Sequence, residues 1–228
     1  IVGYVEGALE AGQNLATPFL IYTLYNPQLR SSYNFVPGIL GMIFILICSI
    51  MTSVSIVREK ETGTMDLLIV SPARPFMIIL GKLVPYFLLS CIILAIMLAI
   101  SYTLLGIPVS RSIINVVSVS LLYICLSLAI GLLVSALVNT QLTALIVSAV
   151  AFMLPVIMLS GMIFPIDNMP AVLQWISCVI PARWYVDAMR RLMIQQADLR
   201  LVMTDVAVLV AMTVLLLFLS IKKFNSSR

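Results

Sequence analysis

Five long apolar stretches constrain the fold of this chain more than any other feature of its 228 residues. A helix of ~20 apolar residues crosses a hydrocarbon core of ~30 Å, and each stretch reaches that length. The first four contain no Asp, Glu, Lys or Arg, and the fifth contains only Asp205, near one end. The sequence therefore predicts an all-α, polytopic membrane protein whose five spans cover residues 36–57, 83–105, 113–138, 142–164 and 202–221.

The composition agrees with a membrane location and excludes several classes of function. Apolar residues make up 62% of the chain and charged residues 10%, whereas soluble domains contain about 45–50% and about 25%. Histidine is absent from the sequence, which excludes Ser-His or Cys-His catalysis and histidine-ligated metals. The sequence has no phosphate-binding loop of the GxxxxGK[ST] kind, and its membrane interior lacks the charges that ion-driven carriers use. We expect no catalytic residue, metal site, bound cofactor or nucleic-acid partner, and an energy source on another subunit.

The distribution of basic residues gives an orientation in the membrane. One side collects all four lysines, and most of the arginines on the opposite side lie in the long 165–201 segment, where the rule counts less. This bias places the 58–82 loop and the C-terminus in the cytoplasm and residues 1–35 outside. The first group is Arg58, Lys60, Arg74, Lys82, Lys222, Lys223 and Arg228, and the second is Arg30, Arg111, Arg183, Arg190, Arg191 and Arg200.

The 58–82 loop is the strongest candidate for a functional element. Four alternating charges close the first span, Gly63 breaks the helix, and a short amphipathic segment follows. Acidic residues do not stabilise a helix C-terminus, so we expect Glu59 and Glu61 to meet basic groups of a cytoplasmic partner. A turn that skims the membrane is the alternative. The predicted docking residues are Arg58, Glu59, Lys60, Glu61, Thr62, Gly63, Thr64, Met65, Asp66, Leu67 and Leu68.

Small residues in the third span predict a close helix contact. Ser127, Gly131 and Ser135 follow one another at intervals of four residues and share one helix face, which lets another helix approach. The contact is either packing within the chain or a dimer seam. In the fourth span, Pro155 removes a helix hydrogen bond, and Ser160-Gly161 follows near the outer end. This pattern indicates either a hinge beside a translocation path or a tolerated kink.

Residues 166–193 predict two short helices that dip into or lie on the outer interface. Residues 171–180 are apolar but too short to cross a bilayer, and Pro181 can open a second helix. Trp184 and Tyr185 favour the headgroup level, and Asp187 can pair with Arg190 or Arg191. We expect Tyr185, Met189, Leu192 and Met193 to share one face of this helix. The predicted hinge and outer gate comprises Pro155, Ser160, Gly161, Pro165, Pro181, Trp184 and Tyr185.

Short motifs along nearly the whole chain resemble the permease subunits of ABC-2-type transporters. The likeness is greatest to the exporter branch that carries a large extracytoplasmic domain. The matching residues are Asn26-Pro27-Gln28-Leu29-Arg30-Ser31-Ser32-Tyr33, Val36-Pro37-Gly38, Arg58 to Met65, Ser71-Pro72, Arg74-Pro75, Gly81-Lys82-Leu83, Pro85-Tyr86, Ser160-Gly161, Phe164-Pro165 and Pro181-Ala182-Arg183-Trp184-Tyr185.

The resemblance implies a permease with six spans, of which this chain would hold the second to the sixth. Residue 1 is Ile rather than Met, and we expect a fragment or a processed product. Residues 1–35 would then be the tail of the extracytoplasmic domain, and residues 36–228 the transmembrane domain. By the same resemblance, residues 62–70 are the coupling helix and residues 166–193 contain the outer re-entrant pair that caps the pathway.

The resemblance also implies partners and a location. We expect an ATP-binding subunit that carries ATP and Mg, a second permease copy or paralogue, a periplasmic adaptor protein and the bilayer of a bacterial inner membrane. The predicted cargo is a drug-like, lipid-like or other amphiphilic molecule. The alternatives are a permease for a polysaccharide or another polymer, a non-transporting anchor that recruits an ATPase, and a proton-coupled carrier.

Overall fold

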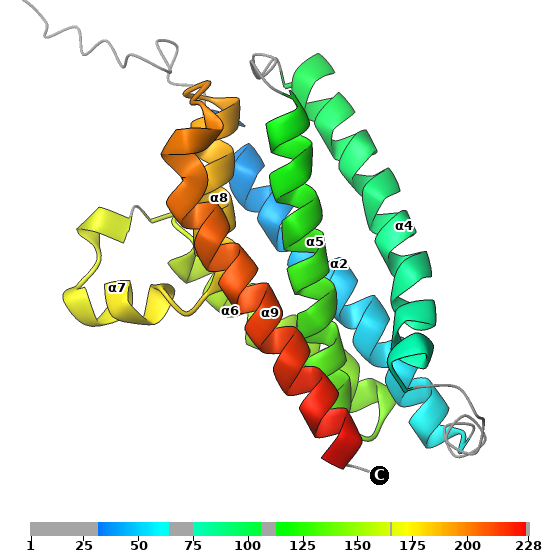
Figure 1. Ribbon diagram of the computed structural model, residues 1–228. Helices are drawn as coiled ribbons and strands as arrows, with labels where there is room; N and C mark the ends of the chain where they lie inside the picture. The colour runs from blue at the N-terminus through cyan, green and yellow to red at the C-terminus, as the bar shows by residue number, and fades with distance from the viewer. Residues whose placement is uncertain (1–31, 64–74, 106–112, 165, 227–228) are drawn as a thin grey trace, which may run out of the picture. The chain divides into compact units, whose positions relative to one another are not determined.

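Helices are the only regular elements in the part of the chain that the computed structural model describes, residues 32–63, 75–105, 113–164 and 166–226. These residues belong to one compact unit, Ser31–Arg228, and the predicted outer-domain remnant falls almost entirely outside them. Figure 1 shows the helices, which are α2 (Ser32–Glu61), α4 (Pro75–Thr103), α5 (Ile113–Leu137), α6 (Gln141–Leu159), η1 (Ile166–Asn168), α7 (Ala171–Ser177), α8 (Pro181–Met193), η2 (Leu199–Val202) and α9 (Met203–Ser226).

Five of these segments are long and apolar enough to cross a membrane, judged by length and composition. They lie in α2, α4, α5, α6 and the continuous η2–α9 segment, where the sequence predicts the five spans. The prediction of an all-α, polytopic membrane protein is therefore confirmed, and the chain is a multi-pass membrane protein.

The loop predicted at residues 58–82 is shorter than expected, because helices extend into it from both ends. Helix α2 continues to Glu61 and ends where Gly63 adopts a φ of 73°, a left-handed conformation that glycine tolerates. Helix α4 begins at Pro75 rather than at residue 83. Proline suits the first helical position, since its missing N–H would have no intrahelical acceptor there. Arg58 to Glu61 therefore form the last turn of α2, beyond the predicted span.

The fourth span is shorter than predicted at its outer end. Helix α6 ends at Leu159 instead of residue 164, with Ser160 as its C-cap and Gly161 at a φ of 80°. Pro155 lies inside α6, which continues for one further turn beyond it. At the other end, the Thr140 hydroxyl accepts a hydrogen bond from the Thr143 backbone N–H, an ordinary N-cap.

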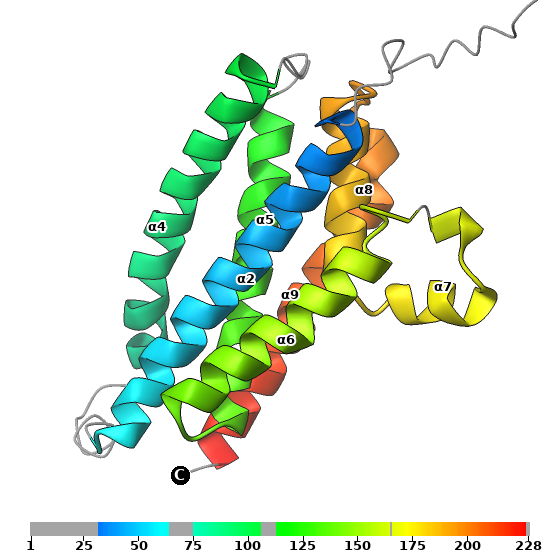
Figure 2. The ribbon, with the colours of Figure 1, turned by 180° about the vertical axis from the view of Figure 1, so that it is seen from behind.

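Helix α5 is the centre of the bundle. It packs against α2, α4, α8 and α9 and more lightly against α6, and it buries a larger share of its residues than any other described span. Figures 1 and 2 show α4, α5 and α9 on one face, with α2 and α6 crossing behind them. Helix α4 is mostly exposed along its length, as expected for a helix whose outer surface meets lipid.

The small residues predicted in the third span mediate packing within this chain. Ser127, Gly131 and Ser135 are all buried. A Cβ atom on Gly131 would lie 2.7 Å from the Ser49 carbonyl oxygen and 2.8 Å from the Thr52 Cβ atom, both on α2. Glycine at this position therefore lets the backbones of α5 and α2 come together, as small residues do between membrane helices.

Buried hydroxyl and thiol groups join α2 to each of its three long neighbours. The Cys48 thiol lies 3.1 Å from the Ser90 hydroxyl of α4, and the Ser53 hydroxyl lies 3.0 Å from the Ser148 hydroxyl of α6. The Tyr123 hydroxyl of α5 donates to the Gly41 carbonyl at 3.2 Å. Hydrocarbon offers no alternative partner for such groups, so each pair favours this arrangement of helices.

The close contact at Gly131 predicts that Gly131→Ala destabilises the protein. The added methyl group meets backbone atoms of α2, which cannot move aside as a flexible side chain can. We expect a loss of about 1–3 kcal/mol in the free energy of unfolding, measured as a lower melting temperature in detergent. Gly81→Ala in α4 is the matched control, because a Cβ atom there meets no other atom within 4 Å. Equal melting temperatures for the two variants would contradict the prediction.

Candidate functional site

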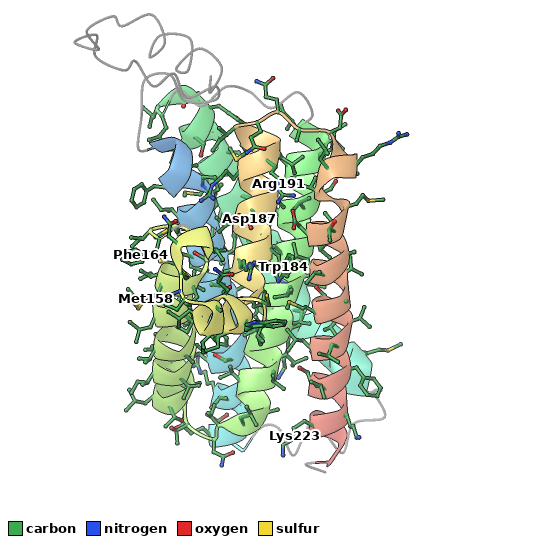
Figure 3. All side chains as sticks on the ribbon, turned by 90° about the vertical axis from the view of Figure 1, so that its left-hand side faces the viewer. Met158, Phe164, Trp184, Asp187, Arg191 and Lys223 are labelled. Carbon is green, nitrogen blue, oxygen red and sulfur yellow. The ribbon has the colours of Figure 1, made fainter. Side chains whose placement is uncertain are left out.

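Four chain segments meet at the end of the bundle that the sequence analysis assigns to the cytoplasm. Figure 1 shows the C-terminal end of α2, the N-terminal end of α4, the α5–α6 turn and the end of α9 there. Lys223, labelled in Figure 3, lies at the same end. The structure thus places both ends of the predicted loop and Lys223 on one side, as the basic residues indicated.

Both acidic residues at the end of α2 have partners within this chain. The Glu59 carboxylate forms an ion pair with the Lys82 ammonium group of α4. The Glu61 carboxylate accepts a hydrogen bond from the Gln141 side-chain amide at 2.7 Å and from its backbone N–H at 3.3 Å. Gln141 is the first residue of α6, so Glu61 also meets the positive end of the α6 dipole. Sequence reasoning assigned these acids to a partner protein and missed both contacts.

Lys60 completes the set of contacts at the end of α2. Its ammonium group donates to the backbone carbonyl of Ser135, in the last turn of α5, where a cation is favourable. Consecutive residues of α2 therefore reach three different spans: Glu59 reaches α4, Lys60 reaches α5 and Glu61 reaches α6. We name Glu59, Lys60, Glu61, Lys82 and Gln141 the cytoplasmic cluster.

The cytoplasmic cluster can transmit movement from the adjoining loop to the bundle. Only Thr62 and Gly63 separate it from residues 64–74, and both are exposed. The side chains of α2 in this cluster contact α4, α5 and α6. Among the predicted docking residues, Arg58 is exposed, whereas Thr64 to Leu68 lie outside the described residues. Docking by this segment stays a prediction.

The predicted outer residues separate into different environments. The Gly161 carbonyl accepts a hydrogen bond at 2.9 Å from Arg190 of α8, while the buried Ser160 hydroxyl has no partner among the described residues. Pro181 is the first residue of α8, as predicted. The Trp184 indole N–H donates to the Cys178 carbonyl at 3.0 Å. Pro165 lies outside the described residues, and the gate and hinge roles stay predictions.

Tyr185 is a residue of the bundle interior rather than a lipid-facing residue. It is fully buried and stacks on Tyr123 of α5, with ring centroids 4.1 Å apart and planes 12° from parallel. Phe44 of α2 meets the Tyr185 ring edge-on at 6.4 Å, and the Tyr185 hydroxyl lies 3.1 Å from that of Ser120. The three aromatic rings hold α8 against α2 and α5. The predicted apolar face of α8 is confirmed, since Tyr185, Met189, Leu192 and Met193 are all buried.

The polar face of α8 carries two ion pairs. Asp187 lies 3.7 Å from Arg190, which confirms the predicted pairing. Arg191 instead pairs with Asp205 of α9 at 3.4 Å. Asp205 is buried, so this contact neutralises the acid that the fifth span carries. The pairing joins residues of two helices and has no signal in the local sequence.

Two cavities lie beside this part of the chain. An apolar cavity of about 510 Å³ is formed by α6, α7 and the connection between them. A polar cavity of about 410 Å³ is lined by Gly161, Ile166, Arg183, Asp187, Arg190, Arg191 and Gln195. No group of three or more Asp, Glu or Cys side chains with metal-binding geometry occurs within the described ranges.

Comparison with known proteins gives a consistent set of relatives. Residues 7–222 match the family model of the ABC-2 family transporter protein. The chain is 34% identical over 203 residues to the probable multidrug ABC transporter permease YbhS of Escherichia coli, covering 84% of this chain and 54% of the relative. For the permease YbhR of the same organism the identity is 34% over 189 residues, covering 83% and 51%.

A more distant relative is ABC transporter G family member 20 of Dictyostelium discoideum, which is 27% identical over 208 residues. That match covers 89% of this chain and 28% of the relative. The chain spans about half the length of the bacterial relatives it matches.

The ion pair between Glu59 and Lys82 predicts a charge-swap effect on stability. Glu59→Lys or Lys82→Glu alone places like charges together and leaves a half-buried charge without its partner. We expect each single variant to lose about 1 kcal/mol or more of unfolding free energy, and the double variant Glu59→Lys/Lys82→Glu to regain most of that loss. Thermal melting in detergent measures all three. Additive losses in the double variant would contradict a direct pairing.

Proposed function

The chain belongs to the ABC-2 family of transporter proteins, and from that membership we propose that it acts as the permease subunit of an ATP-driven exporter. The match to the family over residues 7–222 carries the proposal. Two relatives named as multidrug ABC transporter permeases add support. In this proposal the chain forms the membrane path and catalyses no reaction itself.

The energy for transport comes from a separate ATP-binding subunit that holds ATP and Mg. The proposed docking element is the segment from about Thr62 to residue 70, next to the cytoplasmic cluster. Closure of the ATP-binding subunits pushes on this segment. The contacts of Glu59, Lys60 and Glu61 then pass the movement to α4, α5 and α6. Alternating access to the two sides of the membrane follows from that movement.

The proposed assembly contains a second permease copy or paralogue, and a periplasmic adaptor protein on the outer side. Its location is the inner membrane of a bacterium. The relative YhhJ of Escherichia coli, 26% identical over 196 residues, is named an inner membrane transport permease. The proposed cargo is a drug-like or lipid-like amphiphile, because the described spans expose large apolar side chains and carry hydroxyl groups rather than charges in most of their buried polar positions.

Co-purification tests the proposal. The full-length protein, tagged at its C-terminus, is extracted in mild detergent, and ATPase activity is assayed in the purified material. We expect an ATP-binding subunit to accompany the wild type. Replacing residues 62–70 with a Gly-Ser linker of equal length should lower the recovered ATPase activity at least about tenfold, which corresponds to a loss of about 1.4 kcal/mol in binding free energy.

A Gly-Ser replacement of residues 106–112, which connect α4 to α5, is the matched control and should leave recovery unchanged. The charge-swapped variant Glu59→Lys/Lys82→Glu keeps the internal ion pair but reverses the local charges. A loss of ATPase recovery in this variant would therefore report on docking and not on folding. Full ATPase recovery after replacement of residues 62–70 would refute docking at this segment. Absence of any ATPase from the wild-type preparation would refute the permease proposal.

A further inference from the structure

Residues from one short stretch of the chain line both outer cavities. The connection after α6 contributes Phe164 and Asn168 to the apolar cavity, and Gly161 and Ile166 to the polar cavity. One side of this short segment is therefore bordered by charged groups and the other by hydrocarbon. A ligand that occupies both cavities must have a polar end and an apolar end.

The polar cavity has an excess of positive charge. Three arginines and one aspartate line it, so the sum of the lining charges is 3 − 1 = +2. Asp205 pairs with Arg191 from outside the lining and reduces the local sum to +1. A cavity of about 410 Å³ also lies within the size range of small-molecule sites. The charge and the size together favour an anion.

The arginines of this cavity retain N–H groups that could bind an anion. A guanidinium group has five N–H donors. Arg183 uses Nη1 to reach the Gln174 carbonyl and the Ser177 hydroxyl, and Arg190 uses Nη2 to reach the Gly161 carbonyl. The Nε atoms of Arg183 and Arg190 are buried without a hydrogen-bond acceptor among the described residues and are closed to the cavity, so an anion there would meet the Nη groups of the lining arginines. A phosphate oxygen is a strong acceptor for such donors.

The apolar cavity provides a matching site for a hydrocarbon chain. Its walls are almost entirely apolar and include Leu154, Met158, Phe164 and Leu173. Met158 and Phe164 expose about half of their surface, at 53% and 53%. In Figure 3 they lie closer to the cytoplasmic end, marked by Lys223, than do Asp187 and Arg191. The polar cavity therefore lies farther outward than the apolar one, in the order of a headgroup and its acyl chain in the outer leaflet.

We propose that the two cavities form one binding site for an anionic phospholipid of the outer leaflet. The phosphate group binds among Arg183, Arg190 and Arg191, and an acyl chain lies along the groove between α6 and α7. Bulk lipid covers exposed apolar surfaces such as α4 without selecting a headgroup. The cation-rich cavity next to the groove is what selects an anionic lipid here. The inference concerns binding alone and does not depend on transport or on an ATP-binding partner.

Lipid retention tests the proposal directly. The full-length protein is reconstituted in nanodiscs of phosphatidylglycerol and phosphatidylcholine, re-extracted in detergent, and analysed for bound lipid by mass spectrometry. We expect phosphatidylglycerol to be enriched over phosphatidylcholine. Arg183→Gln and Arg190→Gln should each reduce that enrichment about tenfold, the effect of losing one charge-assisted contact. Glutamine keeps an N–H donor for the carbonyl contact, which protects the fold.

Arg200→Gln is the matched control, because it removes the same charge from an exposed residue of η2 that lines neither cavity. It should leave the enrichment unchanged. Leu173→Gln tests the groove and should also reduce the enrichment, whereas Leu104→Gln, at another exposed apolar position, should not. Equal effects of Arg200→Gln and Arg190→Gln would overturn the proposal, since the headgroup would then respond only to net charge.

A second measurement, with soluble anions, distinguishes a lipid from free phosphate as the ligand of this site. The melting temperature of the protein in phosphatidylcholine nanodiscs is measured with and without inorganic phosphate or glycerol 3-phosphate. A lipid site predicts a much smaller shift from these anions than from phosphatidylglycerol. An equal shift, together with unchanged lipid enrichment in Leu173→Gln, would overturn the lipid assignment in favour of a free phosphate.

Discussion

The approach of α5 to α2 at Gly131 sets the spacing on which the rest of the bundle depends. With a hydrogen atom in place of a side chain, α5 comes close enough to touch the backbone of α2 at Ser49. At that spacing Tyr123 of α5 reaches the Gly41 carbonyl, and Lys60 of α2 reaches the Ser135 carbonyl. The aromatic stack that seats α8 also lies against this pair of helices. A wider separation would remove these contacts together.

Polar groups in this protein follow the rule that the hydrocarbon interior imposes. Inside the bundle they are mainly hydroxyl and thiol groups. Some donate to a carbonyl of their own helix, and others pair across helices, each a small contribution of about 0.6 kcal/mol on average. Charged side chains gather instead toward the two ends. At one end they join α2 to its neighbours, and at the other they surround a cavity. The middle of the described bundle therefore lacks charged side chains. The charged side chains at its two ends make different kinds of contact.

The sequence predicts the spans well, because length and apolar content alone decide which helices fit a bilayer. Helix ends were less predictable, since Pro75 and Gly161 set them through local backbone conformation and not through hydropathy. The close contact at Gly131 was visible as a stripe of small residues, but its partner helix was not. The partners of Glu59 and Glu61 were missed because Lys82 and Gln141 lie far away in the sequence. The outer cavities, too, depend on how α6, α7, α8 and their connections pack, which the sequence does not show.

Side chains of neighbouring helices hold α6 at both of its ends. Glu61 of α2 holds its first residue, and Arg190 of α8 holds the Gly161 carbonyl just past its last. A rod anchored in this way cannot slide along its axis without breaking one of the two anchors. It can flex, and Pro155 is where flexing is easiest, because proline removes the intrahelical donor to the carbonyl of residue 151. Bending at Pro155, the predicted hinge, would leave both anchors in place.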